Sequence, residues 1–311
     1  MFIPFFTHRE KRSTKSLLRR KGGGGGGGRG GGGGGRSGGG ASRGSTSSGT
    51  KSSASTGAKS GPSFSINSGG KGLKASPSGA GGGPKTVIPA GQPFAGREVG
   101  GGSRSQVYGS STYGSGYPGL NGRGVQGRGF PFVFYPVVFS APVGGEAYYL
   151  YREEEYGKAD NSTRPGGPLR QVAFSSPNST FHIVSDNTTV IWLQTAVNSS
   201  CHSSNTFTVS AVQPYNSSQS PYPRPEEAIQ YYRASSVVLT LDGYNNTAAL
   251  GTNETAPAVS LPPTVDAKLL ACINQTIGAT VPLVGAAGRS YTPSACGLLF
   301  IAWVLWLFES L

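Results

Sequence analysis

The amino-terminal part of this 311-residue chain has almost no acidic residues. Residues 1–129 contain two acids, Glu10 and Glu98, against 19 of the 27 lysines and arginines, so this part carries a net charge of +17. Residues 130–311 carry 8 basic and 12 acidic residues, a net charge of −4. The first part also holds 40 of the 51 glycines, and this division excludes a single domain of ordinary composition.

Cysteine and histidine are scarce as well, with three residues of each. The cysteines form no C-x-x-C pair and are too few for a metal quartet. H-E-x-x-H does not occur, and G-x-S-x-G occurs only within the Gly/Ser-rich stretch at residues 35–44, away from any predicted strand. Nothing in the sequence places Asp186 and Asp242 together as a glycosidase pair. We therefore predict a protein that is not an enzyme, with no catalytic residue, no metal and no cofactor. An extracellular hydrolase with an unrecognised site is an alternative.

The middle of the chain lacks a hydrophobic run long enough to span a membrane. Its most apolar stretch, residues 130–143, has 14 residues with three prolines, whereas a spanning helix needs about 20 residues without such interruptions. We predict an extended segment that is buried or leans on a membrane. Just before it, Tyr108, Tyr113 and Tyr117 are spaced by Gly and Ser, and we expect turns whose tyrosines fold over a neighbouring surface.

An apolar run, GLLFIAWVLWLF, does occur near the carboxyl terminus at residues 297–308. It follows small residues that begin at Gly285 and a spacer at residues 288–297, a pattern typical of a glycosylphosphatidylinositol attachment signal. We predict Gly285 as the attachment site and the membrane as the partner. A retained tail anchor from about Ala295 onward and a core helix of a soluble protein are the alternatives.

The acceptor pattern for N-glycosylation, N-x-[ST], is strongly enriched between residues 161 and 276. Random placement of the Asn, Ser and Thr residues of this stretch would give about 2.5 such sequons, whereas eight are present. The pattern predicts a glycoprotein of the cell surface or the secreted fraction. The predicted acceptors are Asn161, Asn178, Asn187, Asn198, Asn216, Asn245, Asn253 and Asn274.

In such an oxidising compartment, Cys201 and Cys272 would form a disulfide. Cys296 would be removed with the tail if the anchor signal is cleaved. Entry into that compartment requires a signal, yet the amino terminus has an apolar run only at residues 1–6, against about 7 to 15 apolar residues in a cleavable signal. We expect entry to be signalled elsewhere, or the native amino terminus to differ.

Residues 1–93 are predicted to form a disordered basic arm. Between residues 21 and 83 the large apolar side chains are Phe64, Ile66 and Leu73, so burial cannot offset the entropy of ordering this segment. We expect a solvated spacer that contacts an anionic surface or cell-wall polysaccharide. The Arg-Gly pairs that begin at Arg123 and Arg128 suggest an intracellular RNA-binding protein as an alternative, although we expect nucleic acid not to be the partner.

Residues 146–284 are predicted to form a small glycosylated α+β ectodomain, an antiparallel sheet with two helices. Residues 94–145 precede it as a Gly/Tyr-rich and apolar segment, and residues 285–311 follow as the anchor signal. Periodicity and turn residues predict strands at residues 171–174, 180–184, 188–193, 206–212 and 236–241. They predict helices at residues 223–233 and 264–278.

Several segments resemble a family of uncharacterised fungal cell-surface proteins. The segments are FAGREVGGGSRSQVYGSSTYGSGYPG, GRGFPFVFYPVVF, YREEEYGKADNSTRPGGPL and IQYYRASSVVLTLDGYNNT, within residues 94–284. The resemblance implies a secreted or anchored protein and contributes no catalytic residue. The sequence thus predicts a non-enzymatic surface glycoprotein with a structural or adhesive role.

Overall fold

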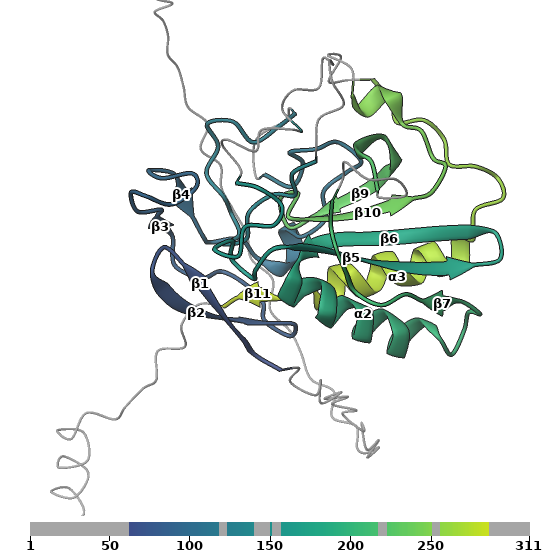
Figure 1. Ribbon diagram of the computed structural model, residues 1–311, viewed down its shortest axis with the longest axis horizontal. Helices are drawn as coiled ribbons and strands as arrows, with labels where there is room; N and C mark the ends of the chain where they lie inside the picture. The colour runs from purple at the N-terminus through teal and green to yellow at the C-terminus, as the bar shows by residue number, and fades with distance from the viewer. Residues whose placement is uncertain are drawn as a thin grey trace, which may run out of the picture. The chain divides into compact units, whose positions relative to one another are not determined.

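The structure, a computed structural model, describes residues 62–117, 123–139, 150, 157–216, 223–250 and 256–285. These residues belong to one compact unit, Thr56–Leu311, with two helices and several antiparallel sheets (Figure 1). The predicted α+β fold class is confirmed. The helices are α2 (Asn187–Cys201) and α3 (Ala267–Thr280). The strands are β1 (Phe64–Ser68), β2 (Lys71–Ser76), β3 (Thr86–Val87), β4 (Glu98–Val99), β5 (Leu169–Ser176), β6 (Ser179–Asp186), β7 (Thr208–Val209), β8 (Gln213–Pro214), β9 (Ala228–Tyr232), β10 (Val237–Leu241) and β11 (Leu283–Val284).

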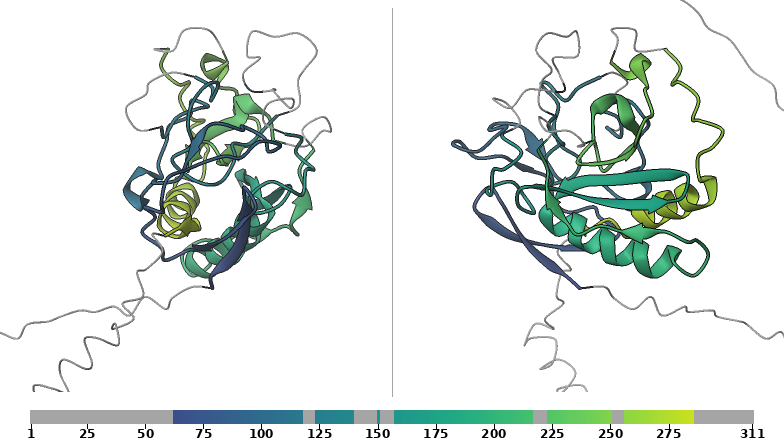
Figure 2. Two further views of the ribbon diagram at one scale, coloured as in Figure 1. Left: turned by 90° about the vertical axis from the view of Figure 1, so that its left-hand side faces the viewer. Right: turned by 45° about the vertical axis from the view of Figure 1, so that its right-hand side comes forward.

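The largest sheet has six antiparallel strands in the order β7-β5-β6-β10-β9, and β8 pairs with the first half of β5. The β5–β6 hairpin pairs all eight residues of each strand, from Leu169 opposite Asp186 to Ser176 opposite Ser179. Both helices lie along one face of this sheet (Figures 1 and 2). The Tyr232 hydroxyl on β9 donates to Asn274 Oδ1 on α3 at 2.9 Å, so Tyr232 points to the helix face.

Aromatic side chains cover the opposite face of the sheet. Because side chains alternate along a strand, Tyr231 points away from the helices, and its ring lies 5.6 Å from that of Tyr113. The Tyr113 hydroxyl in turn donates to the Val137 carbonyl at 2.7 Å. Residues 130 and 132–139 are buried, so the described part of this apolar segment is buried, as expected, although its backbone bends at residues 131–134.

The first strands correct the predicted extent of the disordered arm. Residues 64–76 form the β1–β2 hairpin, and β11 pairs with β2 to make a three-stranded sheet. Gly69 and Gly70 both have positive φ, which a tight two-residue hairpin turn requires and which glycine adopts without strain. The prediction missed Gly-Gly between alternating apolar residues, which is itself a hairpin signal. The remainder of the predicted arm, residues 1–61, lies outside the described residues.

The strand predicted at residues 188–193 is wrong, because these residues lie in α2. Asp186 caps the helix, its carboxylate accepting from the Thr189 amide at 3.0 Å. The buried side chains Val190, Leu193 and Val197 recur at helical spacing. β-branched residues at the start of the segment favoured a strand locally, and burial of this helical stripe outweighs that weak preference.

The helix predicted at residues 223–233 is wrong as well. A single 3₁₀ turn, Pro225–Glu227, leads into strand β9. Tyr231 and Tyr232 are both buried, one on each face of the sheet, because successive side chains of a strand point to opposite faces. The second predicted helix is present as α3, although Asp266 rather than Thr264 caps it. Of the strand predicted at residues 206–212, only Thr208–Val209 is a strand.

The predicted boundaries at residues 93/94 and 145/146 do not separate domains. The buried apolar side chains form one core that includes Ile66, Phe94, Phe134, Phe181 and Ile273, from both sides of these boundaries. Phe64 of the hairpin also meets Trp192 of α2, with ring centroids 6.1 Å apart. These boundaries do not separate domains because the large sheet and its helices have apolar surface that residues before 146 cover.

Candidate functional site

The structure places seven of the eight predicted glycosylation acceptors among the described residues. Asn178, Asn198 and Asn245 are exposed, and Asn161, Asn187, Asn216 and Asn274 are partly exposed. Asn253 lies outside the described residues. By contrast, Asn246, which begins no sequon, is buried beside exposed Asn245. Every described acceptor is therefore at the surface, where a glycan can extend into solvent.

The Asn274 side chain is held by a hydrogen bond from the large sheet. Its Oδ1 accepts the Tyr232 hydroxyl at 2.9 Å, and its backbone carbonyl lies 3.5 Å from the Tyr108 hydroxyl. Burial raises the pKa of Tyr232 well above its ordinary value, so this hydroxyl keeps its proton and remains the donor. A glycan at Asn274 would therefore be attached at a position that is packed against two tyrosines.

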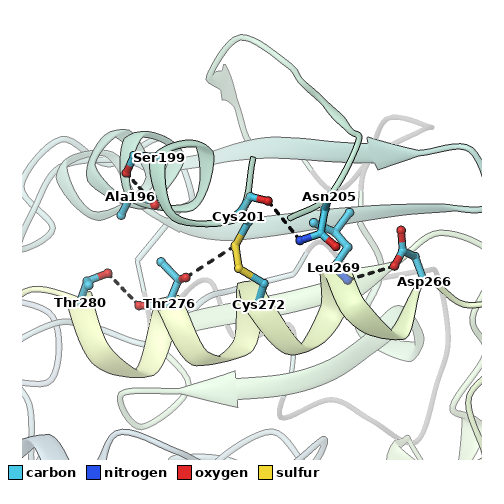
Figure 3. The surroundings of a disulfide bond; sticks show 9 residues. All are labelled: Ala196, Ser199, Cys201, Asn205, Asp266, Leu269, Cys272, Thr276 and Thr280. Atoms are coloured by element: carbon cyan, nitrogen blue, oxygen red, sulfur yellow. Dashed lines mark hydrogen bonds between the residues drawn. A yellow bond between two sulfur atoms is a disulfide. The ribbon is translucent and has the colours of Figure 1, made fainter. Parts of the chain in front are cut away.

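The disulfide expected between Cys201 and Cys272 is present and joins the two helices (Figure 3). Cys201 ends α2, rather than lying in a loop, and its Sγ is 3.7 Å from the hydroxyl of buried Thr276 on α3. The Asn205 amide donates to the Cys201 carbonyl at 3.1 Å, which fixes the end of α2. The bond thus holds α3 against α2 through two cysteines that are 71 residues apart in the sequence.

Replacing both cysteines by serine is expected to lower the free energy of unfolding by about 4 kcal/mol, because the bond closes a long loop in the unfolded chain. Urea unfolding of the C201S/C272S variant, followed by circular dichroism, measures this loss. S203A/S204A, at two exposed serines close to Cys201, is the matched control and should leave the unfolding midpoint unchanged. An equal midpoint for C201S/C272S and the parent protein would show that the bond does not stabilise the fold.

A polar cleft of about 640 Å³ opens between the β1–β2 hairpin, the loop at residues 162–167 and the start of α2. Gly69 and Gly70 of the hairpin turn and Gly166 and Gly167 of the loop expose backbone to it. The lining side chains are mostly amides and hydroxyls: Ser65, Asn67, Gln92, Ser162, Thr163, Asn187 and Thr188, together with Ile66 and Arg164. No carboxylate or lysine is among these described lining residues. The cleft therefore matches an uncharged ligand that is rich in hydroxyl groups.

Arg164 supports the wall of this cleft from inside. Its side chain is buried and donates to the backbone carbonyls of Tyr135, Pro136 and Gly157. Burial lowers the pKa of Arg164 to about 10, which still leaves the guanidinium charged at neutral pH. The charged Arg164 side chain thus stabilises the irregular backbone at the carbonyls to which it donates.

A second polar cluster lies on the face of the large sheet away from the helices. His182 on β6 is directly opposite Thr240 on β10, and the Thr240 hydroxyl is buried without a hydrogen-bond partner. His182 Nε2 lies 3.0 Å from Asp242 Oδ1, at an angle that does not form a hydrogen bond. Burial raises the pKa of nearby Glu227, and the charge of Asp242 adds to this shift. The cluster contains acid and base groups, but its only hydroxyl nucleophile, Thr240, is inaccessible to a substrate.

The structure does not bring Asp186 and Asp242 together. The Asp242 amide donates to the Thr180 carbonyl, and Asp186 lies six residues further along β6. At roughly 3.4 Å per residue this separates the two carboxylates by roughly 20 Å, too far for a glycosidase pair. Among the described residues, no group of three or more His, Cys, Asp or Glu side chains could hold a metal ion.

The arginines of the expected Arg-Gly pairs are engaged within the fold. Arg123 donates to the Ala248 carbonyl at 2.7 Å, and Arg128 donates to the Gly114 carbonyl at 3.0 Å while it lies over the Tyr117 ring. Arg97 lies over the Phe94 ring in the same way. These side chains stabilise loops around residues 94–130, which removes Arg123 and Arg128 as free contacts for RNA bases.

The predicted anchor falls mostly outside the described residues. Gly285, its predicted attachment site, is described and forms an isolated antiparallel bridge with Gly82 at the end of β11. Residues 286–311, including Cys296 and the apolar run, are not described. Within the described ranges, no helix has the length and apolar character that a membrane span needs.

Comparison with known proteins adds no relative. No protein-family model, no curated protein and no solved structure matches the chain.

Proposed function

We propose that residues 62–285 are the folded ectodomain of a secreted or surface-anchored N-glycoprotein with a non-enzymatic, structural or adhesive role. The surface position of all seven described sequon asparagines carries this proposal, because a glycan needs an acceptor that remains accessible in the folded protein. The Cys201–Cys272 disulfide supports the same compartment, since disulfides persist where the surroundings are oxidising.

The proposal includes two contacts with the cell surface. A lipid anchor at Gly285 would hold the ectodomain at the outer face of the membrane, as the pattern of residues 285–311 suggests. The basic residues before residue 62 would contact anionic groups or cell-wall polysaccharide. The arginines that the fold uses internally, such as Arg104 and Arg164, do not contribute to this contact.

Gel mobility before and after removal of N-glycans tests the glycoprotein proposal. The full chain, made in a cell that glycosylates other proteins, is expected to shift by several steps when its glycans are removed. Asn178→Gln, Asn198→Gln and Asn245→Gln should each remove one step, because these acceptors are exposed. Asn205→Gln, outside any sequon, is the matched control and should remove none.

Two results would contradict parts of the proposal. A chain that does not shift at all would exclude the glycosylated surface protein and favour the intracellular alternative. Phospholipase treatment of intact membranes tests the anchor separately, since cleavage of the lipid releases the protein into the supernatant. A glycosylated chain that stays with the membrane after this treatment would instead indicate a retained hydrophobic tail.

A further inference from the structure

We propose that the polar cleft holds the protein's own N-glycan, attached at Asn187. This inference rests on the proposed function, because it requires that the sequons be glycosylated. The ligand of the cleft is then carbohydrate that is covalently attached to the same chain. Asn187 is a sequon residue that lines the cleft, whereas Asn161 is near the cleft but does not line it.

The backbone fixes Asn187 in the cleft wall. Asn187 is the first residue of α2, and the next residue, Thr188, donates to the Gly166 carbonyl from both its amide at 3.0 Å and its hydroxyl at 3.1 Å. A Cβ atom on Gly167 would lie 3.3 Å from Asn187 Cβ, so the loop and the helix start are in close contact. A sugar linked to Asn187 would therefore begin at a defined place in the wall.

The groups around Asn187 suit a sugar. No described residue makes a hydrogen bond to the side-chain amides of Asn67, Gln92 or Asn187, so these donors and acceptors are free. Sugar hydroxyls both donate and accept, and amides can satisfy them without any charge. Gly70 has nothing within 4 Å of the position of a Cβ atom, which leaves space above the hairpin turn. The cleft volume of about 640 Å³ lies within the range of small-ligand sites.

Attachment favours this glycan over a free polysaccharide. A ligand tethered next to its site has an effective concentration on the order of millimolar, so it occupies the site even when its contacts are weak. A free oligosaccharide of the same chemistry would have to displace it.

Protection of the glycan from an N-glycosidase tests the proposal. The native full-length glycoprotein is treated with the enzyme, and the occupancy of each sequon is measured by mass spectrometry of its glycopeptides. Asn198, exposed on the same helix, is the internal control. We expect release at Asn187 to be at least tenfold slower than at Asn198 in the native protein, and equally fast after denaturation.

A variant without the free amides, N67A/Q92A, is expected to raise native release at Asn187 at least threefold and to leave Asn198 unchanged. Asn187→Gln, rather than a change at Thr189, removes the glycan for further tests, because the Thr189 hydroxyl accepts from Arg233. If chito-oligosaccharide binds the parent glycoprotein as well as it binds Asn187→Gln, the own-glycan occupant is excluded and a free polysaccharide takes its place.

The outcomes separate this inference from the proposed function. Two results contradict binding of the Asn187 glycan in the cleft: a glycan at Asn198 but none at Asn187, or equally fast release of both glycans from the native protein. Neither result contradicts the proposal of a surface glycoprotein. A chain with no occupied sequon overturns both. If N67A/Q92A does not change the slow release at Asn187, the amides do not hold the glycan. This result would also contradict binding of the glycan in the cleft.

Discussion

Replacing Arg233 by methionine is expected to lower the free energy of unfolding by about 3–5 kcal/mol, because it leaves a buried carboxylate without its partner. Arg233 is fully buried, and its Nη2 lies 2.6 Å from Asp186 Oδ2. Burial lowers the pKa of Arg233 to about 10, and the neighbouring Asp186 limits that shift. Arg233 therefore stays charged at neutral pH, in a place where water cannot solvate it.

Arg233 also connects segments that are distant in sequence. Its guanidinium donates to the Thr189 hydroxyl of α2 and to the Pro282 carbonyl before β11, at 3.1 Å and 2.9 Å. The same group lies 3.5 Å from the centre of the Phe134 ring, which adds a cation–π contact in the core. Replacing Arg233 therefore removes contacts that join the large sheet to α2, to the buried aromatic segment and to the residues before β11.

The turn that contains Arg233 has an unfavourable backbone conformation, which the contacts of Arg233 help to stabilise. Arg233, Ala234 and Ser235 all have positive φ, at 50°, 48° and 60°. Non-glycine residues in this region cost about 1–2 kcal/mol each, so three in succession need compensation from the surrounding structure. The hydrogen bonds of Arg233, including that from Nε to the Ser236 hydroxyl at 2.7 Å, supply part of it.

Urea unfolding of the Arg233→Met variant measures the expected loss, with Arg224→Ala as the matched control. Arg224 is largely exposed, and its ion pairs with Glu226 and Glu227 should be worth at most about 1 kcal/mol. Arg233→Lys keeps the charge but not the hydrogen bonds, and it should be intermediate if the methionine variant is too unstable to purify. A loss for Arg233→Met no larger than that for Arg224→Ala would show that the buried pair is not a central contact.

A double-mutant cycle separates the pair from the other contacts of Arg233. Asp186→Asn keeps the oxygen that caps α2 through the Thr189 amide and removes the negative charge that faces Arg233. The cost of Arg233→Met should therefore be smaller in the Asp186→Asn background, by more than about 1 kcal/mol. Additive losses would show that the ion pair contributes little and that packing dominates.

A protein that begins at residue 94 is expected not to fold cooperatively, whereas one that begins at residue 62 retains every contact of the described residues. Starting at residue 94 removes β1, β2 and β3 and takes buried Ile66, Ala75 and Ile88 from the core. Burying one large aliphatic side chain contributes about 1.5–3 kcal/mol, and the total stability of a domain is about 5–15 kcal/mol. Arg104 would also lose the Pro77 and Gly79 carbonyls that it binds.

Thermal unfolding of the two truncated proteins tests this expectation. The protein that begins at residue 62 should show one cooperative transition near that of the full chain, and the other should show none. Ile66→Ala in the full chain gives a milder version of the same test and should cost about 2–5 kcal/mol. Equal transitions for both truncated proteins would show that residues 62–93 do not stabilise the fold, in line with the prediction of a disordered arm up to residue 93.

Local patterns predicted the elements whose signals agree with their tertiary surroundings. α3 was predictable because a cap, an apolar residue every fourth position and polar residues between them all indicate a helix. β6 and β10 were predictable because β-branched and aromatic residues form short runs between turn residues. The disulfide was predictable because Cys296 lies in the predicted tail, which leaves Cys201 and Cys272 as the remaining pair if the compartment is oxidising.

The candidate site was only partly predictable. The sequons identify Asn187 from its neighbours alone, but the cleft beside it joins residues 65–70, 92 and 162–167, which are far apart in the chain. The role of Arg233 was not predictable either, because its partners Asp186, Phe134 and Pro282 become neighbours only in the folded chain. Such sites depend on contacts between distant segments, which no window of sequence contains.

The sequence by itself thus determined the α+β class, the uneven charge and the sequons, since each follows from composition or from residues close together in the chain. It also left a single pair of cysteines outside the apolar tail. Only the tertiary structure decided that residues 64–76 are strands, that residues 188–193 are helical and that residues 228–232 are a strand. The physical reason is that local preferences amount to fractions of a kcal/mol per residue, whereas burial against the core contributes several times more at each apolar side chain.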